Sequence, residues 1–216
     1  MLGENILLIN KPIGISSAQV GNRIKKILNI QKVGHAGTLD KEASGLLIFG
    51  LNQGTKKLPL FQELPKTYKV QIKLGIKTDT DDLSGKIIEK KLARGVTRNQ
   101  IEEVLKEFLG KKPQVPPIYS AVKLQGKPAY KLAREGEKIE LKPKLVELFS
   151  FEILEFKLPY LTLILKTSKG FYVRSLVRDL GEKLGCGATV AALIRTQIGP
   201  YSLSQAKTVS EISPQA

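Results

Sequence analysis

The sequence predicts an α/β (α+β) protein with a mixed, mostly antiparallel central sheet flanked by helices. Two observations lead to this fold class. Segments typical of strands outnumber amphipathic segments typical of helices, and the two kinds do not alternate as regularly as in a parallel α/β fold. The 216 residues also contain neither an internal repeat nor a low-complexity linker. We therefore expect one compact domain.

The N-terminal third predicts two buried strands and two helices. An apolar run at 6–9 indicates the first strand, and another at 45–50 indicates the second. Between them, Ser16 and Gln19 have the spacing of a capping box, and apolar residues follow at helical intervals. Residues 52–64 predict a short helix that a proline interrupts.

The middle of the chain begins with a strand of alternating pattern. Residues 66–78 place apolar side chains at every second position, which is typical of a half-buried antiparallel strand. An acidic loop at 78–85 and a strand at 86–91 follow. Thr97 and Gln100 then form a second capping box, so we expect an amphipathic helix that ends at a glycine.

The C-terminal part predicts two long strands at 144–156 and 158–170. Residues 172–185 form an amphipathic pattern closed by glycine, which indicates a helix. A last short helix is expected at 202–212. We see no spare apolar helical stripe, so we expect a monomer.

The net charge is +15, from 35 Lys and Arg residues against 20 Asp and Glu residues. Such a surplus favours a polyanionic partner, above all nucleic acid, because Lys and Arg displace counterions from phosphates. An acidic membrane surface or an ordinary solvated surface remains an alternative. Residues 111–142 hold eight Lys and Arg against three Glu and several prolines. They predict a basic, irregular excursion with a short helix near 130–134.

The chain has one cysteine, Cys186, and one histidine, so an internal disulfide and a cysteine-based zinc site are excluded. A metal site would need carboxylates alone. No apolar run reaches the roughly 18 residues of a membrane span. The N-terminal segment lacks the pattern of a signal peptide. We therefore expect a cytoplasmic protein without a membrane anchor.

The segment GHAGTLDKEASG (34–45) reads as a glycine-rich loop that holds His35 and Asp40. It lacks the lysine of a P-loop and the G-x-G-x-x-G pattern of a dinucleotide-binding loop. A plain turn and a catalytic role for Asp40, as nucleophile or general base, remain open. A catalytic carboxylate would need a fixed cation, which Arg174 or Arg178 could supply.

The acidic loop does not fit a calcium site. Counted from Asp79, the fifth and twelfth positions are Leu83 and Lys90, which cannot bind the ion. We expect Asp79 and Asp81 to accept hydrogen bonds from nearby backbone N–H groups instead.

Four other side chains enter structural and functional interpretations that stay open. Arg174 and Arg178 are either a solvated i, i+4 pair or, in the case of Arg174 with Tyr172, part of a pocket. Tyr68 is either a core residue or a surface on which a base stacks. The residue pattern alone does not decide between these alternatives.

Five segments in fixed order resemble the motifs of the TruB-type tRNA pseudouridine synthases, which convert uridine 55 of the T-loop. The segments are NKPIGISSAQV (10–20), VGHAGTLDKEASGLLIFG (33–50), KTYKVQIKLGIKTDTDDLSG (66–85), PPIYSAVKLQGKPAYKLAREGE (116–137) and GFYVRSLVRDLG (170–181). The resemblance covers nearly the whole chain. It implies the pseudouridine-synthase fold, no cofactor, no metal, and the T-arm stem-loop of tRNA as partner.

The resemblance also implies roles for single residues. Asp40 matches the catalytic aspartate, His35 the histidine associated with flipping out the target nucleotide, and Tyr68 the tyrosine that stacks on the target base. Arg174 matches the arginine of a Tyr-x-Arg segment that pairs with the catalytic carboxylate. The remaining matches are Tyr172 in that segment, Asp82 as the aspartate that holds the arginine, Leu193 as an apolar contact to the base, and Lys11 with Pro12 as support of the site.

The basic segment 116–142 resembles the RNA-gripping thumb of the family and is called the thumb segment below. Within it, we expect Lys123, Lys127 and Lys131 to contact the RNA backbone. We expect residues 1–205 to form the catalytic domain and 206–216 a short stub without a complete PUA domain.

One departure is Lys41, where the family usually has proline after the catalytic aspartate. Two alternatives to the simple enzyme stay open. The chain could be a tRNA-folding chaperone, or a synthase that depends on a guide RNA or partner proteins.

Overall fold

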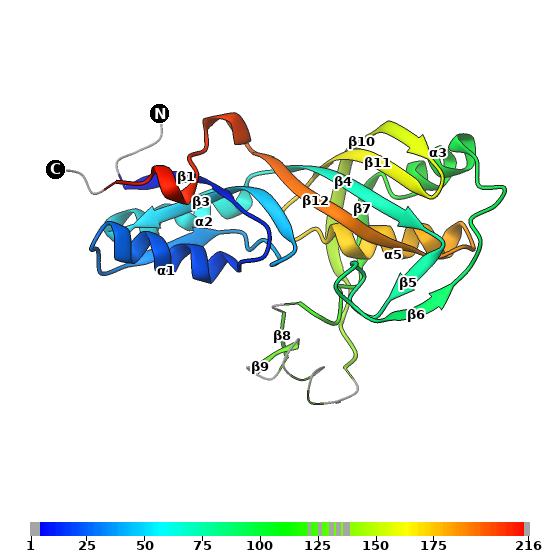
Figure 1. Cartoon of the computed structure of the whole chain (residues 1–216), viewed down its shortest axis with the longest axis horizontal. Coiled ribbons are helices and arrows are strands. Elements are labelled where there is room, and N and C mark those ends of the chain that lie inside the picture. The colour runs from blue at the N-terminus through cyan, green and yellow to red at the C-terminus, as the bar shows by residue number, and fades with distance from the viewer. Residues whose placement is uncertain are drawn as a thin grey trace. The chain divides into compact units, whose positions relative to one another are not determined.

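The structure is a computed structural model that describes residues 5–120, 122–124, 127–129, 132, 135 and 139–213. The chain divides into two compact units (Figure 1). Unit 1 consists of Met1–Lys69 and Ala192–Ala216, and unit 2 consists of Val70–Ala191. The chain passes from one unit to the other within β4 (Lys66–Leu74) and again within β12 (Ala188–Ile198).

Unit 1 is built around the central strand β3. Its elements are β1 (Ile6–Lys11), α1 (Ser17–Ile27), β2 (Val33–Ala36), β3 (Ala43–Leu51), the 3-10 helix η1 (Asn52–Lys57), α2 (Leu58–Glu63), β13 (Tyr201–Ser202), and the 3-10 helices η2 (Leu203–Gln205) and η3 (Val209–Glu211). Strands β1 and β2 pair antiparallel with β3, whereas β12 pairs parallel with its start.

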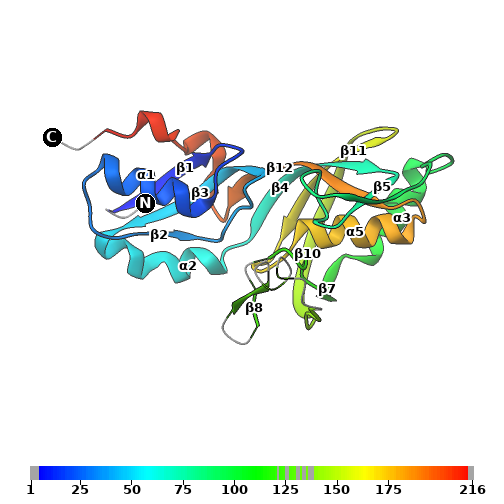
Figure 2. The same cartoon turned by 60° about the horizontal axis from the view of Figure 1, so that its bottom comes forward.

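Two apolar clusters lie on opposite faces of β3, because successive side chains of a strand point to opposite sides. Leu47 and Phe49 pack in one cluster with Val20 and Ile24 of α1. The neighbouring even-numbered residues of β3 pack in the other cluster with Leu58 of α2. Figure 2 shows α1 and α2 on the two sides of these strands. Unit 1 therefore has three layers, helix, sheet and helix.

The segment after β13 packs on unit 1. Lys207 donates its backbone N–H to the Leu8 carbonyl oxygen, and the Asn10 N–H donates to the Lys207 carbonyl oxygen. Val209 and Ile212 join the cluster beside α1. The expected domain boundary at residue 205 stays a prediction.

In the part of unit 2 that the structure describes, antiparallel strands combine with the helices α3 and α5. Its elements are β5 (Ile76–Thr78), β6 (Ile87–Lys90), α3 (Arg98–Glu107), β7 (Gly110–Gln114), β8 (Lys123–Leu124), β9 (Lys127–Pro128), β10 (Lys144–Lys157), β11 (Tyr160–Thr167) and α5 (Val173–Lys183). Strand β10 pairs antiparallel with both β7 and β11, and β5–β6 and β8–β9 are separate antiparallel pairs.

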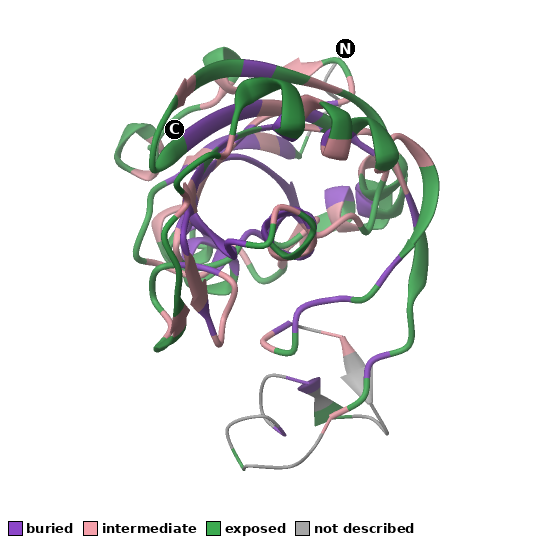
Figure 3. Cartoon of the chain, turned by 90° about the vertical axis from the view of Figure 1, so that its right-hand side faces the viewer, coloured by how far each residue is buried: buried purple, intermediate pink, exposed green. Residues whose placement is uncertain are grey.

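Helices α3 and α5 contribute the apolar side chains that cover the sheet of unit 2. The buried ones are Ile101, Leu105, Val173, Leu176, Val177 and Leu180. Purple buried and green exposed segments occur along the same strands in Figure 3, as expected for a half-buried sheet. No helix in the described part of the chain is long and apolar enough to cross a bilayer.

The predicted mixed, mostly antiparallel sheet is confirmed, and so are both capping boxes. The prediction of one loop over 34–45 is wrong at both ends, because β2 ends at Ala36 and β3 begins at Ala43. Pairing with β3 forms β2, and its four residues carry too little pattern to reveal a strand. The predicted helix at 202–212 is instead two single 3-10 turns. Of the predicted helix near 130–134, the structure describes Leu132 alone, so this prediction is not tested.

Candidate active site

Asp40 lies on the short loop between β2 and β3, and its neighbours in the chain are fixed. Leu39 is buried, and its N–H and carbonyl both bond Ser17 Oγ at 3.0 Å. The Lys41 carbonyl accepts from the Gly14 N–H at 2.9 Å. Asp40 itself is exposed. The chain thus presents this carboxylate from a loop held on each side.

Lys11 supports the same loop from the end of β1. Its side chain is fully buried, and Nζ donates to the carbonyl oxygens of Pro12, Ile15 and Lys41 at 2.9, 2.7 and 3.4 Å. Burial lowers the pKa of Lys11 to about 8, although the Asp40 carboxylate acts in the opposite direction. Lys11 therefore ties strand and loop together and places a cation near Asp40.

Arg195 of β12 is a residue of this site that the sequence analysis missed. It is 1% exposed, and it donates from Nε to the Leu46 carbonyl at 2.8 Å and from Nη2 to the Gly37 carbonyl at 2.9 Å. Its guanidinium also bonds the Tyr68 side chain. No local pattern indicated this role, because it depends on partners that are distant in the sequence.

Two residues with expected base contacts lie in unit 1 near this arginine. Tyr68 on β4 is 8% exposed, and Leu193 on β12 is 9% exposed. Leu193 stands opposite Ala43, where β3 leaves the Asp40 loop. Both side chains are largely buried, which agrees with a role in the core. However, Tyr68 also bonds the Arg195 guanidinium, and Leu193 lies beside the loop that carries Asp40.

His35 lies on β2 rather than in a loop. Its Nε2 is 3.2 Å from Thr38 Oγ1, and its ring centroid is 5.8 Å from that of Phe49. Burial, and next the Arg195 charge, lower the pKa of His35 below its ordinary value of 6.5. The imidazole is therefore neutral at neutral pH.

Arg174 begins the first turn of α5 in unit 2 and is held by the acidic loop. It is 5% exposed, and it donates to the carbonyls of Thr80 and Tyr119, each at 2.9 Å. Asp82 Oδ2 lies 3.9 Å from Arg174 Nη1. Asp82 Oδ1 accepts from Thr80 Oγ1 at 2.7 Å and from the Ser84 N–H at 3.0 Å. The interpretation of Arg174 as a solvated surface residue is wrong.

Tyr172 and Arg178 attach α5 to the segment that leads into the thumb segment. The Tyr172 N–H donates to Gln114 Oε1 at 2.8 Å, and Gln114 Nε2 donates to the Tyr172 carbonyl at 3.1 Å. Arg178 donates to the Val115 carbonyl at 3.2 Å. Gln114 is a second residue that the sequence did not reveal, because no pattern around it indicates its bonds to the Tyr172 backbone.

The expected turn role is confirmed for Asp79, whose Oδ1 accepts from the Lys86 N–H at 2.8 Å. Asp81 behaves differently, because its Oδ2 pairs with Arg178 Nη1 at 3.4 Å. Its backbone has a φ of 61°, which aspartate tolerates better than most residues. Burial raises the pKa of Asp81 to about 6, against the effect of Arg178.

The predicted RNA-backbone lysines are only partly described. Lys127 is exposed on β9, and Lys123 lies on β8. Lys131 lies outside the described residues. Within the described ranges, no group of His, Cys, Asp and Glu side chains could hold a metal ion.

Two family profiles match adjacent parts of the chain. "TruB family pseudouridylate synthase (N terminal domain)" covers residues 25–173, and "tRNA pseudouridylate synthase B C-terminal domain" covers 174–215. The proteins named tRNA pseudouridine synthase B from Thermotoga maritima and Francisella tularensis are each 42% identical to the chain. The matches span 98% and 97% of this chain, and 68% and 70% of those proteins.

Among solved structures, a chain of a Cbf5-Nop10-Gar1 complex superposes with a TM-score of 0.74 at 29% identity. The match covers 95% of this chain and 52% of that one, so this chain spans about half its length. The fold and these similarities define a pseudouridine synthase. Within that class, the chain belongs to the TruB family of pseudouridylate synthases.

Proposed function

We propose that the protein isomerises uridine to pseudouridine at position 55 in the T-loop of tRNA. Two named relatives at 42% identity, matched over nearly the whole chain, support this function. The observation that carries it is the Asp40 loop, whose flanking residues are pinned by Ser17, Lys11 and Arg195. A carboxylate that must react at one atom of a substrate needs such preorganisation.

The reaction breaks the C1′–N1 glycosidic bond, rotates the uracil, and joins C1′ to C5. C5 loses its hydrogen as a proton and N1 gains one, so the atoms balance without oxidation or hydrolysis. Asp40 starts the reaction either as a nucleophile or as the base that removes a proton to form a glycal. Both routes need an ionised carboxylate.

The target base must leave the stacked RNA, which costs a few kcal/mol. Tyr68 offsets part of that cost, because stacking of a base on an aromatic ring contributes about 1–3 kcal/mol. Leu193 gives a further apolar contact to the base. The His35 ring occupies the place in the base stack that the target base leaves. This role needs no proton transfer, so a neutral ring can perform it.

Arg174 is the cation proposed to pair with the Asp40 carboxylate. Two carbonyl groups immobilise its guanidinium, which lies beside Asp82, so the positive charge is held in a fixed position. Such a charge-assisted pair orients the carboxylate toward the substrate. Tyr172, fixed by Gln114, sets the start of the helix that carries this arginine.

The deciding experiment measures tritium release from tRNA labelled at C5 of uridine, for the wild type and Asp40→Asn. The amide keeps the size of the side chain but can act neither as nucleophile nor as base. We expect release by the wild type, no release by the variant, and equal tRNA binding by both. Turnover by Asp40→Asn would refute the assignment of Asp40.

Two other activities are separable from this one. A tRNA-folding chaperone would bind wild-type tRNA without releasing tritium. A guide- or partner-dependent synthase is suggested by the similarity to a chain of a Cbf5-Nop10-Gar1 complex. Turnover of a naked T-arm stem-loop by the purified protein alone would argue against both.

The proposed enzyme is a cytoplasmic monomer, and we propose that Lys123, Lys127 and Lys131 contact the RNA backbone. The buried thiol of Cys186 is free, which suits a reducing compartment.

A further inference from the structure

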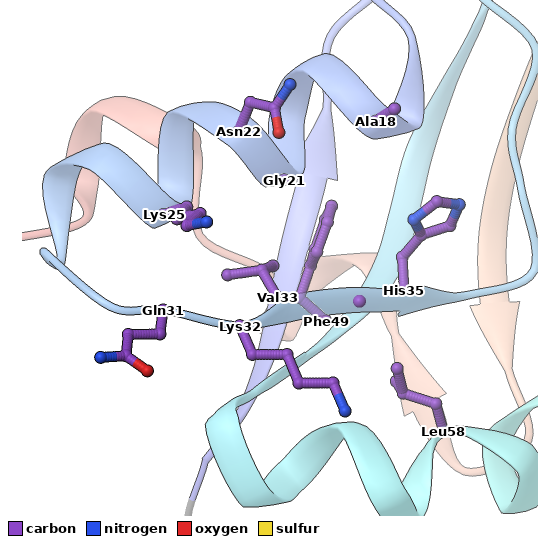
Figure 4. Close-up of a pocket in the computed structure, with 11 residues that line it drawn as sticks. Ala18, Gly21, Asn22, Lys25, Gln31, Lys32, Val33, His35, Phe49 and Leu58 are labelled. Atoms are coloured by element: carbon purple, nitrogen blue, oxygen red, sulfur yellow. The ribbon is translucent and has the colours of Figure 1, made fainter.

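A polar groove lies in unit 1 between α1 and β2, with a volume of about 510 Å³. Figure 4 shows that it is bordered by α1 on one side and by the strand that carries His35 on the other. Its lining residues are Ala18, Gly21, Asn22, Lys25, Gln31, Lys32, Val33, Gly34, His35, Phe49 and Leu58. We call it the α1–β2 groove. His35 is its one lining residue with a proposed role in the reaction.

The charge of the groove is positive, and the described part of the chain does not neutralise it. Lys25 and Lys32 are exposed, and the lining contains no Asp or Glu. Within the described residues, neither ammonium group has a carboxylate oxygen within 4.0 Å. Asn22 and Gln31 add exposed side-chain amides, which can both donate and accept hydrogen bonds. The lysine ammonium groups can bind a phosphate, and the amides can bind a polar group attached to it.

The floor of the groove is apolar. The fully buried Phe49 ring lies directly beneath the surface, under Gly21. A Cβ at Gly21 would lie 3.3 Å from the Phe49 ring carbon Cε1. Val33 and the His35 ring continue the surface along β2. An apolar floor between cationic walls fits one unpaired nucleotide, with its phosphate on a lysine and its sugar and base on the partly exposed Val33 and His35 side chains.

The α1–β2 groove lies close to the Asp40 loop along the chain, because His35 lines the groove. Five residue steps separate His35 from Asp40, a reach of at most about 18 Å of extended chain. We propose that the α1–β2 groove binds a nucleotide of the substrate RNA strand that flanks the target uridine, through Lys25 and Lys32. This inference rests on the proposed function, because that function supplies an RNA whose target base leaves the stack.

The test is a coupling measurement between protein and RNA. Dissociation constants are measured for T-arm stem-loops that carry one uncharged methylphosphonate linkage at each loop position in turn. The proteins are the wild type, Lys25→Ala, Lys32→Ala and Lys26→Ala. Lys26 is the matched control, because it has the same charge, lies in the same last turn of α1 and does not line the groove.

We expect Lys25→Ala and Lys32→Ala each to weaken binding and to reduce the log–log salt slope by about 0.7, the value for one single-strand phosphate contact. One linkage should weaken wild-type binding but cause no further loss in the Lys25→Ala protein. Lys26→Ala should still show the full loss at that linkage. Equal effects of Lys25→Ala and Lys26→Ala, or no coupling at any linkage, would overturn the proposal.

The outcome is distinguishable from failure of the proposed function. Binding is measured without turnover, so coupling at one linkage together with no tritium release would retain the groove and refute the enzyme. Normal tritium release with no coupling at any linkage would retain the enzyme and refute the groove proposal. Thermal unfolding of each variant checks that the lysine changes leave the fold intact.

Discussion

Gly45 shows why a residue of the Asp40 loop must be glycine for reasons of packing. Its φ is 107°, and a Cβ there would collide with the Arg195 carbonyl oxygen and lie 2.7 Å from the Arg195 nitrogen. The glycine thus lets β12 approach β3 where Arg195 reaches the loop. From the sequence, this glycine was expected to lie in a loop. At Gly45 the approaching group is another strand.

We therefore expect Gly45→Ala to destabilise the protein by about 3 kcal/mol or more, from the sum of left-handed backbone strain and overpacking. The matched control is Gly14→Ala. Gly14 also has a positive φ, 87°, but no atom lies within 4 Å of its Cβ position, so only about 1 kcal/mol is expected.

Chemical denaturation of both variants checks the difference. Equal decreases in the free energy of unfolding for Gly45→Ala and Gly14→Ala would mean that the contact with Arg195 adds nothing beyond the backbone strain.

At the scale of elements, α5 holds two separate segments of unit 2 in place. Ser175 Oγ donates to the Val115 carbonyl at 2.7 Å, next to the Tyr172–Gln114 pair of hydrogen bonds. Two turns of one helix therefore fix both the acidic loop and the root of the thumb segment. Arg178 takes part in both attachments, through Asp81 and through Val115.

Replacing Arg178 by Met should make stability depend more on pH. Asp81 has a folded-state pKa of about 6, above its ordinary 3.8, so it destabilises the fold increasingly as pH rises from about 4 to beyond 6. Arg178 and Arg174 oppose this rise in pKa, whereas Asp179 and Asp82 add to it. Loss of Arg178 moves the folded-state pKa further up. We expect a loss of about 1–3 kcal/mol at pH 8 and a smaller loss at pH 5.

The measurement is the free energy of unfolding at both pH values, with Asp81→Asn combined with Arg178→Met as control. In the combined variant the losses at pH 5 and pH 8 should differ less, and the remaining difference comes from Asp179, whose Oδ1 lies 2.9 Å from Arg178 Nη2. A single-variant loss that did not change with pH would show that Arg178 acts through packing alone.

The elements that the sequence predicted well are those with a local pattern. The α1 and α3 capping boxes and the alternation of β4 each lie within a dozen residues, and all three were correct. Strand β2 and the buried role of Arg195 depend on pairing with distant residues, so no local pattern could reveal them. Of the candidate site, the residue types were predictable by resemblance, whereas the groups that hold Lys11 and Arg174 required the fold.

At the scale of the whole molecule, the +15 charge predicts RNA binding that weakens steeply with salt. Replacing Lys123, Lys127 and Lys131 together by Ala should reduce the log–log slope by about 2 to 3, at about 0.7–0.9 for each lost phosphate contact. The salt dependence of the tRNA dissociation constant measures this slope.

The control replaces three exposed lysines outside the thumb segment, Lys86, Lys90 and Lys157, with the same change of net charge. We expect that control to retain most of the slope. Identical slopes for both triple variants would show that only the total charge matters.

Unit 1 is assembled from both ends of the chain, and this has a consequence during protein synthesis. Residues 1–69 leave the ribosome first, but Arg195 emerges more than 120 residues later. At typical rates of synthesis this delay is on the order of 10 s. During that time Gly37 lacks the hydrogen bond from Arg195, whereas every described partner of Arg174 has already been made. The loop that carries Asp40 therefore reaches its final anchoring only when β12 has been made.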